Sequence, residues 1–465
     1  MSEQTMIEAD LLVTGAEIIT MNHARDVISD GTLAISGNRI VMVGKREEAL
    51  RTVKAGRVMD GEGFVISPGF VDGHIHITAD PLTRGFVRRL PEDSWGNNLA
   101  KWVIPLFQLQ TAEDEQLAAQ LSALTMIRYG TTTFLEAGTV IQMEAVMEAL
   151  SATGIRGRVG QWVEGRDWGS SGNETTKIDE AIGLLQAEVE AWPDDGDALL
   201  AAWPVLVGHS TNPDEVWLAA KQIADENGLK VSAHMSPRQS DPDWFLKQYG
   251  RRPLEHLADI GAMGPNVLLT HLAAIDASEL AVLAETGASC IHCPDAAFLG
   301  GMGLARQGLH VEMLERDVTV MLGTDGLTTD ILSSARRMAA GYRDARGDQD
   351  LLPSTTLLEL ATVNGARAMG WEDRIGALAP GYKADFVMHD TRRVEWGPVF
   401  DSVGQLALCA PPDGVHHVWI DGKQVLDAGR NLLLDEEKLL ADAVQAGKAL
   451  VERTGLPVRK PWPVQ

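Results

Sequence analysis

The chain has 465 residues, 45% of them hydrophobic, and a formal net charge of −25. This length exceeds the needs of one small core, so we expect either two domains or one large barrel with additional segments. The acidic surface would repel phosphate groups, which argues against nucleic acid as a partner.

The cysteines and the first residues predict a cytoplasmic protein. Cys290, Cys293 and Cys409 are too few for a disulfide framework and fit a reducing compartment. The N-terminal sequence MSEQTMIEADLLV has neither the basic nor the apolar region of a secretory signal. No apolar run reaches the roughly 18 residues that a membrane span requires, so we expect no membrane partner.

Both ends of the chain show the pattern of β-strands. Residues 8–60 contain short apolar runs that alternate or are interrupted by glycines, and the pattern returns at 376–390 and 414–429. We therefore predict one small β-sandwich domain built from both chain ends, at 1–65 and 373–440. Residues 441–465 are expected to form a C-terminal helix and tail.

The central part, 66–372, has a different rhythm. Short apolar runs alternate with longer segments whose apolar residues recur every three to four positions, as in amphipathic helices. The candidate strands are GFVDGHIH, GTTTFLEAG, GRVGQWVEG, AAWPVLVGHS, KVSAHMS, NVLLTHLA, ASCIHCP and TVMLGTDG. Strands that alternate with helices in this way predict an α/β fold, namely a (β/α)8 TIM barrel.

Potential metal ligands lie at the ends of five of these strands. They are His74, His76, His234, His271, His292 and Asp325. The active site of a TIM barrel lies at the carboxyl ends of its strands, and residues i and i+2 of a strand share one face. A single buried histidine is usually a packing residue, but this set is hard to explain by chance. Three imidazoles and a carboxylate bind a divalent metal and leave one position open for water.

Several stretches carry a resemblance to a known family. They are PGFVDGHIHI, RRPLEHLADIGAMGPNVLLTHLAAID, ASCIHCPDAAFLGG, VMLGTDG and IGALAPGYKADFVMHD. From about residue 8 to 430, the chain resembles the amidohydrolase superfamily and, more narrowly, its cytosine-deaminase and triazine-hydrolase branch. The resemblance implies one metal ion bound by His74, His76, His234 and Asp325. It also implies that His271 contacts the activated water or the substrate, and that His292 lies at the substrate edge.

Two departures from the family pattern bear on the chemistry. The fourth candidate strand ends without the carboxylated lysine of binuclear members, which predicts a single metal ion. Pro237 stands where aminohydrolases of the branch carry a glutamate that moves a proton to the ring and the leaving amine. In addition, Asp295 stands where serine is usual.

The missing glutamate directs the functional prediction. Thiocarbamate hydrolases such as molinate hydrolase, and the phenylurea hydrolases, lack it and release leaving groups that need less help than ammonia. We therefore expect a mononuclear metal-dependent hydrolase that cleaves a carbamoyl-type C–N or C–S bond. The alternative is an aminohydrolase or chlorohydrolase that acts on an N-heterocycle. A third reading, an inactive scaffold, is disfavoured because all candidate ligands are present.

Roles and partners complete these expectations. His271 and Asp325 are predicted to be catalytic, and Trp95, His292 and Asp295 to bind substrate. The cofactor is one divalent metal, which this ligand set leaves open among zinc, cobalt, iron and manganese. We expect a small, largely apolar organic substrate and a homo-oligomer. For His209 the sequence leaves two readings open, a substrate contact or a packing residue, and for Glu136 a support for a ligand histidine or a solvated carboxylate.

Overall fold

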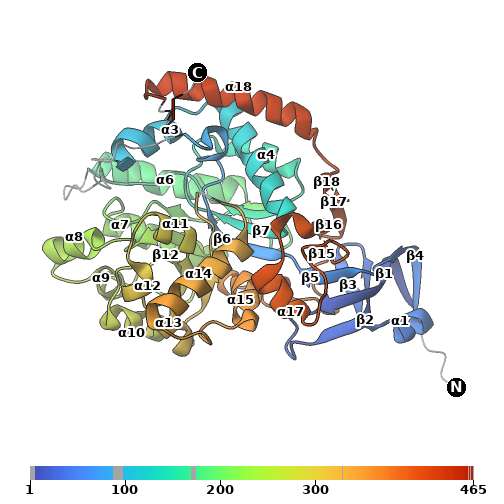
Figure 1. Ribbon diagram of the computed structural model, residues 1–465. Coiled ribbons are helices and arrows are strands. Elements are labelled where there is room, and N and C mark those ends of the chain that lie inside the picture. The colour runs from blue at the N-terminus through green and yellow to red at the C-terminus, as the bar shows by residue number, and fades with distance from the viewer. Residues whose placement is uncertain are drawn as a thin grey trace.

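The computed structural model describes residues 6–86, 98–168, 174–326, 328–458, 460 and 462–463, without the side chain of residue 100. The fold is mixed α/β. Within the described residues, one sheet combines the two chain ends, and two parallel sheets with helices form the central part (Figure 1). In Figure 1 the blue N-terminal strands and the red β15 and β16 lie side by side on one flank of the molecule.

The sheet of the chain ends runs in the order β18-β17-β16-β15-β5-β1-β2-β3, with β4 paired to β1. Its strands are β1 (Ile7–Ile19), β2 (Val27–Ser36), β3 (Arg39–Lys45), β4 (Val53–Asp60), β5 (Phe64–Pro68), β15 (Phe386–Asp390), β16 (Val415–Ile420), β17 (Lys423–Asp427) and β18 (Arg430–Asn431). The antiparallel pair β5–β15 joins the two ends, with Ile66 opposite Met388. The predicted association of both ends is therefore present as one sheet with its own apolar core.

The central strands form two parallel sheets. The first contains β6 (Phe70–Ile75), β7 (Thr131–Glu136), β8 (Arg156–Val159) and β9 (Leu200–Ala202). The second contains β10 (Val205–Leu206), β11 (Val231–Met235), β12 (Val267–His271), β13 (Ser289–His292) and β14 (Val320–Leu322). Only Trp203 and Pro204 separate β9 from β10, and a bridge between Ile75 and Asp325 links β6 to the end of β14. This arrangement is consistent with the expected barrel.

Helices follow these strands as the apolar periodicity predicts. They are α4 (Ala112–Arg128), α5 (Met143–Ser151), α6 (Thr175–Ala191), α7 (Asp214–Asn227), α8 (Ser240–Tyr249), α9 (Pro253–Asp259), α10 (Ala277–Thr286), α11 (Pro294–Leu299), α12 (Leu304–Gln307), α13 (His310–Glu315), α14 (Ile331–Arg346), α15 (Ser354–Ala361) and α16 (Val363–Met369). The side chains of Asp276 and Asp330 cap the N-termini of α10 and α14, where they accept backbone N–H groups of the first turn.

The remaining helices lie outside this alternation. They are α1 (Arg46–Thr52), η1 (Pro81–Thr83), η2 (Leu99–Val103), α3 (Ile104–Gln108), α17 (Ser402–Gly404), η3 (Gln405–Cys409), η4 (Pro412–Gly414) and α18 (Glu436–Thr454). The last of them, α18, packs against α4 and α3 and begins within the range expected for the second β segment. None of the described helices has the length and apolar character that a membrane crossing requires.

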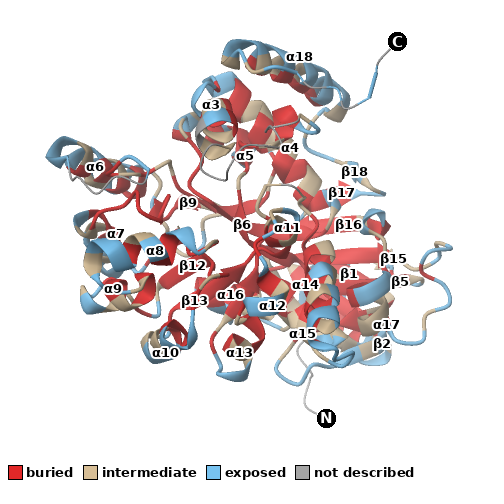
Figure 2. Cartoon of the chain, turned by 60° about the vertical axis from the view of Figure 1, so that its left-hand side comes forward, coloured by how far each residue is buried: buried red, intermediate tan, exposed pale blue. Residues whose placement is uncertain are grey.

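The centre of the molecule is formed by continuously buried strands. Every residue of β6 and β7 is buried, as expected for parallel strands covered on both faces. Figure 2 shows β6, β9, β12 and β13 in the buried interior, with the exposed surface on the surrounding helices. The strand ends that carry the candidate ligands are thus held by a rigid, close-packed core.

A buried ion pair joins this core to the sheet of the chain ends. Arg156 on β8 binds Asp385, just before β15, through two contacts of 3.0 and 3.2 Å. The two side chains are only 4% and 2% exposed. Substituting Asp385 by alanine should lower the free energy of unfolding by about 3–5 kcal/mol, because it leaves the guanidinium buried with only Asp421 as an ionic partner. Urea unfolding would test this. Glu8→Ala, at the exposed Glu8–Lys54 pair, is the matched control and should change little.

Candidate metal centre

The candidate ligands lie at strand ends whose backbone has an unusual shape. Five residues there other than glycine have positive φ angles: His209 (53°), Ser236 (50°), His271 (79°), Leu272 (50°) and Asp325 (63°). Such residues are uncommon outside glycine and cluster at functional sites, where the surrounding structure enforces them. Here the buried parallel sheets hold the turns that direct side chains toward one centre.

Gly208 allows two of these strand ends to approach closely. It has a φ of +80°, and a Cβ atom there would lie 2.0 Å from the carbonyl oxygen of His234. No other residue type fits this contact without displacing the His234 backbone. The glycine thereby lets His209, at the end of the fourth strand, lie directly beside His234, to whose carbonyl oxygen it donates its backbone N–H at 3.2 Å.

The imidazole nitrogens of His74, His76 and His234 converge at this centre. His234 Nδ1 lies 3.0 Å from the carbonyl oxygen of Val207, which only accepts, so Nδ1 carries the proton and Nε2 is free. This Nε2 lies 3.5 Å from His76 Nε2, which is 3.3 Å from Asp325 Oδ1. His74 contacts Thr270 Oγ1 through Nδ1 at 3.0 Å, and its buried Nε2 has no hydrogen-bond partner among the described residues. Such converging lone pairs fit a divalent cation, and the contacts of the other ring nitrogens orient the ligands.

Two further side chains, those of His271 and Cys293, also contribute atoms to this centre. Ligand atoms of His74, His234 and His271 lie within 4.8 Å of one another, as do those of His74, His76 and Asp325. The same limit holds for His271, Cys293 and Asp325. The structure therefore brings together all five residues predicted to be ligands or catalytic, and it adds Cys293. Cys293 was not among the predicted ligands, because a C-x-x-C pair on a strand places its two sulfurs on opposite faces; its position directly after β13 brings it to the centre.

Burial keeps two of the imidazoles neutral. It lowers the pKa of His74 and of His234 well below the usual 6.5, with neighbouring imidazoles adding to the effect. Protons therefore compete with a metal for these two nitrogens only at acidic pH. NMR titration of the metal-free protein should therefore show neither His74 nor His234 protonated between pH 8 and pH 6. A protonation midpoint of either ring above pH 6 would contradict this.

Asp325 is ionised, and a buried network supports its strand end. Burial opposes its negative charge, but the hydrogen bond from His76 and the nearby imidazoles outweigh this and lower its pKa. Asp72, fully buried on β6, accepts the backbone N–H groups of His74 and Thr324 at 3.2 and 3.0 Å and the Thr324 hydroxyl. Burial raises the pKa of Asp72 to about 7. Asp72 thus ties the β6 end to the β14 end, a role that its place inside an apolar strand did not reveal.

His209 forms a polar pair with Asp241 at the edge of the centre. Its Nδ1 lies 2.5 Å from Asp241 Oδ2, which also accepts the backbone N–H of Ser236 at 2.9 Å. Its ring stacks against that of His234, with centroids 5.5 Å apart. Because the carboxylate holds the Nδ1 proton, His209 Nε2 is left as an acceptor. Sequence reasoning missed Asp241, which lies on α8.

Glu136 takes neither of its two expected roles. It is fully buried, and its carboxylate accepts the backbone N–H groups of Gly138 and Thr139 and the Thr139 hydroxyl. Burial raises its pKa to about 7. It therefore shapes its own loop, and none of its hydrogen bonds in the described part of the chain reaches a ligand histidine.

Two of the three predicted substrate contacts, His292 and Asp295, are buried. His292 is 1% exposed and packs on His310, with ring centroids 4.0 Å apart. Asp295 has no exposed surface and is bound by the Ser334 hydroxyl and by Arg337. Trp95 lies outside the described residues. Contact of these three residues with a substrate stays a prediction.

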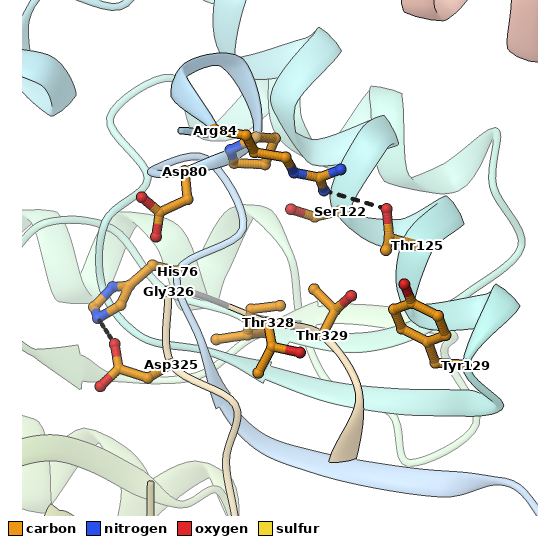
Figure 3. A pocket seen from close by; sticks show the side chains of 12 residues that line it. His76, Asp80, Arg84, Ser122, Thr125, Tyr129, Asp325, Gly326, Thr328 and Thr329 are labelled. Carbon is orange, nitrogen blue, oxygen red and sulfur yellow. Dashed lines mark hydrogen bonds and ion pairs between the residues drawn. The ribbon is translucent and has the colours of Figure 1, made fainter. Parts of the chain in front are cut away.

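A polar cavity adjoins two of the candidate ligands. Its volume is about 240 Å3, and it lies between α4 and the segment that follows β14 (Figure 3). In Figure 3, His76 and Asp325 point toward each other at one side of it. The other polar side chains around it are Asp80, Arg84, Ser122, Thr125, Tyr129, Thr328 and Thr329. Since a water molecule occupies about 30 Å3, the cavity has room for several waters or for part of a small ligand.

Aromatic side chains border another part of the centre. The Phe107 ring stacks on that of His76 at 6.4 Å, and Trp162 meets Phe107 edge to face at 6.1 Å. Trp168, which is 39% exposed, lies 4.9 Å from the His209 ring. The centre thus combines a polar cavity with an apolar, planar surface.

Comparisons with known proteins find relatives over the whole chain. The amidohydrolase family pattern matches residues 65–425. A 5-methylthioadenosine/S-adenosylhomocysteine deaminase from Pelotomaculum thermopropionicum is 31% identical and covers 96% of this chain and 100% of its own. A 5'-deoxyadenosine deaminase from Methanosarcina mazei is 30% identical and covers 96% of this chain and 99% of its own.

Solved structures support the same fold. An adenosine deaminase from Xanthomonas campestris with bound zinc has a TM-score of 0.86 at 24% identity, covering 96% of this chain and 100% of that chain. A zinc complex of atrazine chlorohydrolase from Arthrobacter aurescens has a TM-score of 0.83 at 21% identity, covering 94% and 100%. At these identities the likeness shows the fold alone.

These relatives correct the functional prediction. The expectation of a carbamoyl-type hydrolase for a thiocarbamate or a phenylurea is wrong, because the curated relatives that match the whole chain are deaminases. Their names favour the alternative, hydrolysis at an N-heterocycle. The absence of a glutamate at Pro237 constrains the path of a proton, but it does not define the substrate.

Proposed function

The chain belongs to the amidohydrolase family, and from this we propose that it is a metal-dependent aminohydrolase, which replaces an exocyclic amino group of an N-heterocycle by oxygen. The observation that carries the proposal is the convergence of imidazole nitrogens from His74, His76 and His234 with the Asp325 carboxylate. We infer that the parallel strands β6 to β14, with β9 and β10 taken as one interrupted strand, close one eight-stranded barrel. We also infer that a single metal ion occupies its mouth. The deaminase names of the curated relatives support the reaction class.

The residues of this centre divide the chemistry among them. A divalent metal bound here supplies an activated water molecule as the nucleophile. Asp325 is ionised and accepts a proton from that water at its carboxylate. His271 Nε2 lies 3.9 Å from Asp325 Oδ2, within reach of the oxygen on which negative charge develops. Burial lowers the pKa of His271 to about 4, so it acts as a neutral donor.

Pro237 requires another residue to move the proton to the leaving amine. His209 is the candidate, because Asp241 holds its Nδ1 proton and leaves Nε2 as an acceptor beside His234. We assign to the His209–Asp241 pair the transfer that the glutamate performs in other aminohydrolases of the branch. His209 follows β10, which pairs with β11, the strand whose end normally carries the glutamate, and Asp241 lies on α8 after β11.

The surroundings of the centre support a planar and largely apolar substrate. Phe107 and Trp162 offer ring faces and edges beside His76, and aromatic contacts of this kind favour stacked heterocycles. The polar cavity next to Asp325 is lined by the Asp80 carboxyl group and the Arg84 guanidinium, which suit an acceptor and a donor role toward a polar substituent. An adenine-type ring meets these requirements.

A second candidate reaction is removal of chloride from a chlorinated N-heterocycle. Pro237 favours it, because chloride leaves without receiving a proton. The structural likeness to atrazine chlorohydrolase concerns the fold alone and does not distinguish the two reactions.

A substrate panel tests the proposal. The zinc-loaded protein would be incubated with adenosine, 5'-deoxyadenosine, 5-methylthioadenosine, free aminopurines and chlorinated triazines, and ammonia and chloride would be measured. Release of ammonia that stops after chelation of the metal supports the proposal. Release of chloride alone would replace it by the second candidate, and no turnover of any heterocycle would contradict both.

A further inference from the structure

Two buried side chains near His271 have no part in the chemistry described above. His310, the first residue of α13, and Tyr342, on α14, are both fully buried. They reach the end of β12 from the outer helices. His310 contacts the backbone of His271, and Tyr342 contacts His310.

The direction of these hydrogen bonds follows from simple donor rules. His310 Nε2 lies 2.7 Å from the carbonyl oxygen of His271, which only accepts, so Nε2 carries a proton. Burial lowers the pKa of His310 to about 4, which leaves the ring neutral with a single proton. Its Nδ1 is therefore an acceptor, and the Tyr342 hydroxyl, 2.9 Å away, donates to it. The chain of bonds runs from Tyr342 through His310 to the His271 peptide.

His271 depends on its backbone for its orientation. Its Nδ1 has no hydrogen-bond partner among the described residues, and the Asp325 carboxylate lies 3.9 Å from its Nε2. The backbone itself is left-handed at both His271 and Leu272, with φ angles of 79° and 50°. Such a conformation persists in these residue types only where surrounding contacts enforce it. The His310 bond acts on the peptide that joins these two residues.

We propose that His310 and Tyr342 are positioning residues, which hold the left-handed His271–Leu272 peptide and so aim the His271 imidazole at the reacting atoms. The His292 ring, tilted against that of His310 with centroids 4.0 Å apart, packs this pair against the end of β13. The inference rests on the proposed role of His271 in hydrolysis. It gives a role to two side chains that lie outside the metal centre and that no sequence pattern singled out.

Four variants test the proposal. Tyr342→Phe removes the hydroxyl with little change in volume, His310→Ala removes the donor, and His310→Gln keeps an N–H that reaches the same carbonyl. Tyr249→Phe is the matched control, because Tyr249 stacks on the buried His256 away from the metal centre. Since small misplacements of a reacting group cost up to about 100-fold, we expect kcat to fall about tenfold in Tyr342→Phe and about 100-fold in His310→Ala.

The pattern across variants separates positioning from general damage. KM, zinc content and melting temperature of Tyr342→Phe should match the wild type, and His310→Gln should recover most of the kcat that His310→Ala loses. Equal losses in His310→Gln and His310→Ala, or a kcat within about twofold of wild type in His310→Ala, would overturn the proposal.

Crystal structures of the variants provide a readout that does not depend on turnover. The His271–Leu272 backbone should leave the left-handed region in His310→Ala and keep it in His310→Gln. An unchanged backbone in His310→Ala would overturn the positioning role. If the wild type turns over no heterocycle, the proposed function fails, and these structures still decide whether His310 and Tyr342 position His271.

Discussion

Replacement of Asp325 by asparagine should lower kcat by about 10³–10⁴-fold, because the ionised carboxylate both faces the metal and accepts the proton of the attacking water. Asparagine keeps the size of the side chain and tolerates the left-handed backbone at this position, where φ is 63°. The loss should therefore appear in kcat without a comparable loss of folding. Steady-state kinetics on the best substrate of the panel, with zinc content measured in parallel, gives the result.

Asp317→Asn is the matched control for this substitution. Asp317 is exposed and also has a left-handed backbone, with a φ of 57°, so the same chemical change is made at a similar turn outside the centre. It should leave kcat and zinc content unchanged. An Asp325→Asn protein that retains zinc and more than about a tenth of wild-type kcat would remove Asp325 from the catalytic step.

Replacement of Asp241 by asparagine should lower kcat by about 10²–10⁴-fold, the range expected when a positioned acid–base group is lost. The amide no longer fixes the Nδ1 proton of His209, so the proton can move to Nε2 and remove the acceptor that the proposal requires. KM should change little. Asp214→Asn, at the His256–Asp214 pair outside the metal centre, is the matched control.

Pro237→Glu provides a second arm of the same test. If the His209–Asp241 pair replaces the missing glutamate, a carboxylate at position 237 should restore part of the activity that Asp241→Asn loses. The effect of Asp241→Asn should then be smaller in the Pro237→Glu background than in the wild type. Equal effects in both backgrounds would show that the two positions serve different steps.

The metal centre was predictable because its residues follow a pattern that strands impose. His74 and His76 are two residues apart at the end of β6. His234 is the penultimate residue of β11, His271 ends β12 and Asp325 closely follows β14, so parallel strands bring them together. This reasoning needs no knowledge of side-chain contacts.

The supporting residues could not be predicted because they reach the centre through contacts between elements. Asp241 lies on α8 and meets His209 across a turn, and His310 and Tyr342 come from two outer helices. Their spacing in the sequence follows no period that a strand or helix repeats. The left-handed backbone at His271 and Leu272 was equally hidden, since leucine rarely adopts it and the enrichment of histidine there does not mark a single position.

The functional prediction failed for a related reason. Pro237 suggests a substrate whose leaving group needs no proton, but His209, which follows β10, and Asp241, on α8, form a polar pair beside His234. A missing side chain at one position therefore limits the chemistry only if no other element can place an equivalent group there.

Isotope-labelled water tests the central claim most directly. The zinc-loaded protein would be incubated in heavy-oxygen water with an amino-substituted purine, and the product and ammonia would be quantified by mass spectrometry and a coupled assay. The account predicts one heavy oxygen per product, one ammonia released with it, and loss of both after chelation. Loss of the amino group without incorporation of heavy oxygen, or turnover that survives complete removal of the metal, would contradict it.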